Sequence, residues 1–74
     1  MRKSEKLLDD FPREYIEEQI FRWVRDEKAR YCLVRNFLDG VPYEQIAEEL
    51  NIVTTTVYYK IRKYQPILFD KLKN

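Results

Sequence analysis

Apolar residues recur every three or four positions along most of this chain, which is the period of an α-helix rather than of a strand. The pattern is clearest between residues 42 and 64, where a short break divides it into two amphipathic stripes. Their apolar members are Ile46, Ala47 and Leu50 in the first stripe and Val57, Ile61 and Tyr64 in the second. Glutamates occupy the helix face opposite the first stripe, as in an amphipathic helix. This segment therefore predicts two helices joined by a tight turn.

Four residues mark where these two helices begin and end. Gly40 has no Cβ and can adopt the positive φ that ends an upstream helix, and Pro42 presets φ for the first turn of the next. Asn51 tolerates the left-handed conformation of a C-terminal cap. The hydroxyl of Thr54 can cap the second helix, which we expect to run from about residue 54 to residue 64.

The same helical period extends towards the N-terminus. A first helix is predicted from Pro12 to about Val24, and a second begins near Asp26 and Glu27. The expected inward residues are Ile16, Ile20, Trp23 and Val24 in the first helix and Ala29, Cys32, Leu33, Phe37 and Leu38 in the second. Residues 1–8 have no capping signal and are expected to be flexible.

Pro66 interrupts the pattern after the pair of helices. Because proline within a helix costs about 3 kcal/mol, the sequence predicts that the helix ends or kinks near Gln65 and that a short last helix follows. The apolar residues of that last helix are Ile67, Leu68, Phe69 and Leu72, and they either cover the core or contact a second subunit. The chain is thus predicted to be all-α, a small four- to five-helix domain over residues 1–74 with a helix-turn-helix at about 42–64.

The composition argues against several classes of function. Cys32 is the only cysteine and there is no histidine, so the usual zinc ligand sets and the usual partner of a catalytic thiol are missing. A single glycine argues against a phosphate-binding loop, and no apolar run approaches the roughly 20 residues that cross a bilayer. We therefore expect no enzyme activity, cofactor, metal or membrane partner. The N-terminus has no apolar export signal, which favours a cytoplasmic location.

Charge is distributed unevenly, although the formal net charge is only +1. Residues 54–74 contain five Lys or Arg and one Asp, whereas residues 9–27 contain seven carboxylates and three arginines. A polyanion would be attracted to the basic C-terminal segment and repelled by the acidic first helix. The position of the cations therefore favours a nucleic-acid partner more than their number does.

The predicted 54–64 helix is polar and aromatic on the side opposite its apolar stripe. At 100° per residue, the side chains that point away from the stripe are Thr55, Tyr58, Tyr59 and Arg62, with Thr56, Lys60 and Lys63 along one flank. Hydroxyls, phenols and cations can hydrogen-bond to base edges and neutralise phosphates. A helix that lies in the major groove of DNA needs both abilities.

The run GVPYEQIAEELNIVTTTV, residues 40–57, resembles the helix-turn-helix of sigma factor region 4 and of LuxR-type regulators. The usual form of that motif is G-x-S-x-x-x-I-A-x-x-L-x-I-S-x-x-T-V. The matching positions are Gly40, Ile46, Ala47, Leu50, Ile52, Thr56 and Val57, whereas Pro42 and Val53 stand where the family usually has serine. The likeness covers about residues 28–68 and implies that the second helix enters the major groove. The DNA-contacting residues that it implies are Thr54, Thr55, Thr56, Tyr58, Tyr59, Lys60, Arg62 and Lys63.

Two functions follow as hypotheses. The first is a small transcriptional regulator that binds double-stranded DNA in a sequence-specific manner. A homodimer would read two half-sites about 34 Å apart and would cover Tyr15 and Phe21, which lie off the first apolar stripe and otherwise pack within the chain. The second is an interaction module that binds RNA polymerase or another regulator through the acidic helix and its aromatics, without touching DNA.

Overall fold

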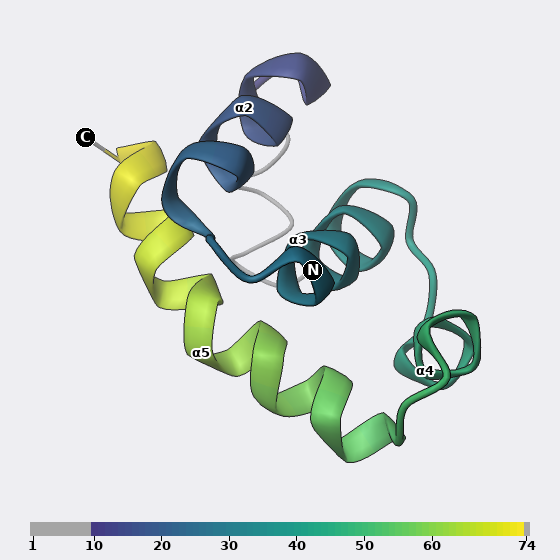
Figure 1. Cartoon of the computed structure of the whole chain (residues 1–74). Coiled ribbons are helices and arrows are strands. Elements are labelled where there is room, and N and C mark those ends of the chain that lie inside the picture. Colours follow the sequence, from purple (N-terminus) through teal and green to yellow (C-terminus); the bar gives the residue numbers. More distant parts are fainter. Residues whose placement is uncertain (1–9, 74) are drawn as a thin grey trace.

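The computed structural model describes residues 10–73, and the segment predicted to be flexible, residues 1–8, lies outside them. The described chain is all-α and contains no strand. Its elements are α2 (Arg13–Trp23), α3 (Glu27–Leu33) with a π-helical continuation η1 (Val34–Leu38), α4 (Tyr43–Leu50) and α5 (Thr54–Lys73). The long helix α5 contacts each of the other three α-helices. As Figure 1 shows, α4 lies beside the start of α5 and α2 beside its C-terminal end.

The core is built from the apolar stripes that the sequence predicts. Its buried members are Ile16, Ile20, Val24, Ala29, Cys32, Leu33, Ile46, Ala47, Val57, Ile61, Leu68 and Leu72. Four other residues expected to face inward, Phe37, Leu38, Leu50 and Tyr64, are half-buried and pack against this cluster. Each α-helix therefore contributes one face to a single core, and α5 contributes along most of its length.

Trp23 was expected in the core, and that expectation is wrong. Its side chain is 39% exposed, whereas Gln19, one turn earlier, is buried. The indole Nε1 donates a hydrogen bond to Gln19 Oε1 at 3.0 Å, and the ammonium of Lys71 lies 4.1 Å from the ring centroid. The indole N–H and the buried side-chain amide of Gln19 both need a hydrogen-bond partner, and each supplies one to the other. Trp23 therefore lies at the edge of the core, where this hydrogen bond can form.

Pro66 does not end the second helix of the motif. α5 continues through Pro66 to Lys73, so the separate short last helix predicted from the sequence is wrong. Pro66 itself is exposed, whereas Leu68 and Leu72 are buried in the core. Burying a leucine side chain is worth about 1.5–3 kcal/mol, so two of them offset the roughly 3 kcal/mol that an internal proline costs.

The turns on either side of α4 follow the sequence prediction closely. Gly40 has φ of +71° and Asn51 has φ of +57°, both in the left-handed region expected at these helix ends. One detail differs, because α5 begins at Thr54 and the residue before it, Val53, takes the N-cap position. The Val53 carbonyl accepts hydrogen bonds from the backbone N–H groups of Thr56 at 3.0 Å and Val57 at 3.4 Å. Thr54 is therefore the first residue of the helix rather than its cap.

A network of charged side chains fixes α4 against the preceding helix. Two guanidinium nitrogens of Arg35 donate to the two carboxylate oxygens of Glu49, at 3.1 and 2.7 Å, and a third donates to Asp39 at 3.1 Å. The hydroxyl of Tyr31 donates to Glu49 at 2.7 Å, and Arg13 of α2 donates to Asp39 at 2.8 Å. The hydrogen bonds from Arg35 and Tyr31 lower the pKa of Glu49 to about 2.

This network predicts an acid-sensitive contribution to stability. Glu49→Gln should lower the melting temperature at neutral pH, because it removes the ionised partner of Arg35. Since the pKa of Glu49 is 4.5 in the unfolded chain and about 2 in the folded one, the contribution is complete above about pH 4.5. It is lost as the pH falls towards 2, so the two proteins should converge there.

Thermal unfolding followed by circular dichroism between pH 7 and pH 2 measures this difference. Glu48→Gln is the matched control, because Glu48 is the exposed neighbour of Glu49 on the same helix. A Glu49→Gln variant that melts with the wild type at pH 7 would contradict the assignment.

Candidate nucleic-acid interface

The helix-turn-helix places α5 so that one side is buried and the other open. Val57 and Ile61 face the core, and the turn between α4 and α5 is only residues 51–53. This short turn and the small Ala47, which is buried, allow the two helices to pack closely. The opposite side of α5 then faces outward along its first three turns.

Most of the residues predicted to contact DNA lie on this outward side. The exposed ones are Thr54, Thr55, Tyr58, Tyr59, Arg62 and Lys63, and Thr56 is half-buried at one edge. Thr55, Tyr59 and Arg62 follow one another at spacings of four and three residues, so they form a continuous stripe. We call these three residues with Tyr58 and Lys63 the recognition face.

Tyr58 is held in place by its neighbours. Its ring centroid lies 6.3 Å from that of Tyr43 on α4 and 5.6 Å from that of Tyr59. The guanidinium of Arg62 donates to the Tyr58 hydroxyl at 2.7 Å and lies 5.5 Å from the ring centroid. Both helices of the motif thus contribute to one aromatic and cationic cluster. Tyr43 was not singled out from the sequence, because only the helix crossing brings it to Tyr58.

Lys60 does not join the recognition face. Its ammonium lies 2.6 Å from the carboxylate of Asp26, and the two side chains are 23% and 32% exposed. Asp26 also caps α3, where its carboxylate accepts hydrogen bonds from the backbone N–H groups of Lys28 and Ala29. The hydrogen bond from Lys60 is the main reason why the pKa of Asp26 is lowered. The pair therefore ties the middle of α5 to the start of α3.

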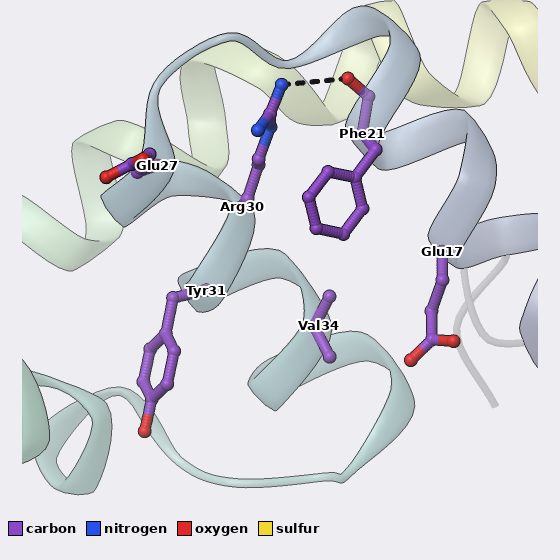
Figure 2. Close-up of a pocket in the computed structure, with 6 residues that line it drawn as sticks. All are labelled: Glu17, Phe21, Glu27, Arg30, Tyr31 and Val34. Carbon is purple, nitrogen blue, oxygen red and sulfur yellow. Dashed lines mark hydrogen bonds between the residues drawn. The ribbon is translucent and has the colours of Figure 1, made fainter.

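A second surface feature lies between α2 and α3. It is an apolar groove with a volume of about 390 Å³, lined by Glu17, Phe21, Glu27, Arg30, Tyr31 and Val34. In Figure 2 the ring of Phe21 and the side chain of Val34 point towards the space between the two helices, and Glu17 stands at its rim. The guanidinium of Arg30 lies 4.7 Å from the Phe21 ring centroid and donates to the Phe21 carbonyl at 2.9 Å. No residue of α5 lines this groove.

The side chains of residues 10–73 that could act as a nucleophile or as metal ligands are a buried cysteine and the carboxylates. Cys32 is buried in the core, and this burial raises the pKa of its thiol, which disfavours the reactive thiolate. Within the described part of the chain, no group of three or more His, Cys, Asp or Glu side chains could hold a metal ion. None of the helices in that same part is both long and apolar enough to cross a membrane.

One comparison with known proteins gives a match. A family model described as a homeodomain-like domain matches residues 24–65, which include α3, η1, α4 and the first half of α5. No curated protein and no solved structure gives a significant match. The match is to a helix-turn-helix domain of general type, and it does not select sigma factor region 4 or the LuxR-type regulators among such domains.

The double role of Asp26 predicts unequal effects at the two ends of its ion pair. Asp26→Ala removes both the helix cap and the ion pair and should lower the free energy of unfolding by about 1–2 kcal/mol. Lys60→Met keeps the aliphatic stem and removes only the ion pair, so it should cost less than about 1 kcal/mol. Urea denaturation measures both variants, and equal losses would contradict a capping role for Asp26.

Proposed function

We propose that this chain, which belongs to the homeodomain-like helix-turn-helix family, binds double-stranded DNA with α5 in the major groove. Domains of this kind generally bind DNA. The observation that carries the proposal is the open recognition face, because hydroxyls, phenols and a guanidinium stand together on the side of α5 opposite Val57 and Ile61. The N-terminal turns of such a helix contact base edges, and its flanks contact phosphates.

The cations in the first three turns of α5 have different roles in this proposal. Lys63 is exposed, and its ammonium lies 5.3 Å from the ring centroid of Tyr64, at the flank where a phosphate backbone would pass. Arg62 is oriented by Tyr58, so its remaining donors are held in a fixed direction. Lys60 is paired with Asp26, so we assign it to the structure of the domain and not to the DNA contact.

The finer points of the function are also proposals. A single domain of this size makes few contacts with DNA, so we propose a homodimer that reads two half-sites about one helical turn, roughly 34 Å, apart. Sequence-specific binding by such a dimer would regulate transcription in the cytoplasm of its host. The resemblance of residues 40–57 to sigma factor region 4 adds RNA polymerase as a partner to be tested.

The salt dependence of DNA binding tests these assignments. Lys63→Gln should reduce the slope of log K against log salt concentration by about 0.9, which corresponds to the loss of one phosphate contact. Lys60→Gln is the matched control, and it should leave the slope unchanged because its ammonium is already paired. Fluorescence anisotropy with a labelled duplex gives both slopes. A flat salt dependence of the wild type would remove the support for DNA binding through this face.

A second candidate function is protein binding, and the α2–α3 groove favours it. Its floor is apolar, with Phe21 61% exposed, and carboxylates of Glu17 and Glu27 stand among its lining residues. The occupant that fits this chemistry is a protein segment with one apolar side chain flanked by cations.

Variants on the two surfaces distinguish the two candidate functions. If the groove binds RNA polymerase, the purified enzyme should be retained by the wild type and by Arg62→Ala but not by Phe21→Ser. Phe21 lies outside the recognition face, so Phe21→Ser should leave DNA affinity unchanged. Retention of polymerase by Phe21→Ser would exclude the groove as its binding site.

A further inference from the structure

The start of α5 presents methyl groups and aromatic rings but no charge and no amide. Over residues 53–59 the exposed side chains are Val53, Thr54, Thr55, Tyr58 and Tyr59. Val53 is 67% exposed and Tyr59 is 64% exposed, so this apolar surface is open and not part of the core. Within α5 the one arginine is Arg62, and one of its guanidinium nitrogens already donates to the Tyr58 hydroxyl.

This surface lacks most of the residue types that usually recognise bases. In the major groove, guanine is typically read by Arg or Lys, adenine by Asn or Gln, and cytosine by Asp or Glu. Residues 53–59 contain none of these six residue types. Thymine is distinguished by its C5-methyl group, which makes apolar contacts with side chains such as the methyl of threonine or an aromatic ring.

We propose that the first two turns of α5 recognise the C5-methyl groups of thymines, so that the preferred half-site is rich in thymine at the positions that these turns contact. This inference rests on the proposed DNA binding and names the chemical group that the recognition face reads. Thr55 and Tyr59 carry it, because they lie one turn apart on the outward side of the helix. Their separation along the axis is about 6 Å, so each can reach a different base pair.

Tyr58 supports this arrangement from the side of α4. Tyr43 and Arg62 limit the positions that its ring can take, and the rings of Tyr58 and Tyr59 pack edge to face. Fixing the rings before binding reduces the conformational entropy lost when they contact a methyl group. The apolar contacts are therefore made by side chains that need little rearrangement.

The experiment begins with the full chain and a random-sequence duplex library, from which bound duplexes are selected. The selected site is then synthesised with deoxyuridine in place of each thymidine, which removes only the methyl group and keeps the base pair. Since a buried methyl contributes about 0.8 kcal/mol, we expect affinity to fall about fourfold for each contacted thymine.

Two variants at one position identify the side chain that makes the contact. Thr55→Ser removes the methyl group and keeps the hydroxyl, whereas Thr55→Val keeps a methyl and removes the hydroxyl. At the thymine read by residue 55, the ratio of thymidine to deoxyuridine affinity should fall from about four to about one in Thr55→Ser and should persist in Thr55→Val. Because each ratio compares two duplexes with the same variant, altered stability of the variant cancels.

The outcomes separate the two proposals. If no duplex is retained, the proposed DNA binding fails and the methyl contact fails with it, and if duplexes are retained without enrichment of any sequence, DNA binding stands and the methyl contact is overturned. If duplexes are enriched but the deoxyuridine sites bind as tightly as the thymidine sites, DNA binding stands and the methyl contact is overturned. The same holds if Thr55→Ser and Thr55→Val give identical ratios.

Discussion

The burial of one side of α5 is the constraint on which the rest of this structure depends. Val57, Ile61, Leu68 and Leu72 lie along that side, and α2, α3 and α4 each pack against the helix. A helix whose rotation is fixed by four buried side chains must present the opposite side to solvent. The recognition face is therefore exposed because of how the core is packed.

Polar contacts add what a small core cannot supply alone. A chain of this length buries only about 60% of the surface it exposes when unfolded, so each ion pair between helices matters for stability. Lys60 and Asp26 join α5 to the cap of α3, and Arg35 joins the π-helical segment to Glu49 of α4. One connection holds α5 and the other holds α4, so together they help to fix both helices of the motif relative to α3 and its π-helical continuation.

The molecule offers two surfaces of different chemistry, formed by different helices. The recognition face on α5 combines hydroxyls, phenols and cations, whereas the groove between α2 and α3 is apolar and has two glutamates and one arginine in its lining. DNA and a basic protein segment would therefore be attracted to separate places. No residue of α5 lines the groove, so the two surfaces share no side chain.

Local information in the chain was sufficient for the helices, the core stripes and the two left-handed positions. Helical periodicity places Ile16, Ile20, Val57 and Ile61 on inward faces, and the φ preferences of Gly40 and Asn51 depend only on their own side chains. Tertiary packing decided the rest, as the continuous helix through Pro66, the outer position of Trp23 and the pairing of Lys60 with Asp26 show. Each of these depends on residues far apart in the sequence: the burial of Leu68 and Leu72 against distant helices offsets the cost of Pro66, and Lys60 meets its carboxylate partner only after α5 has packed against α3.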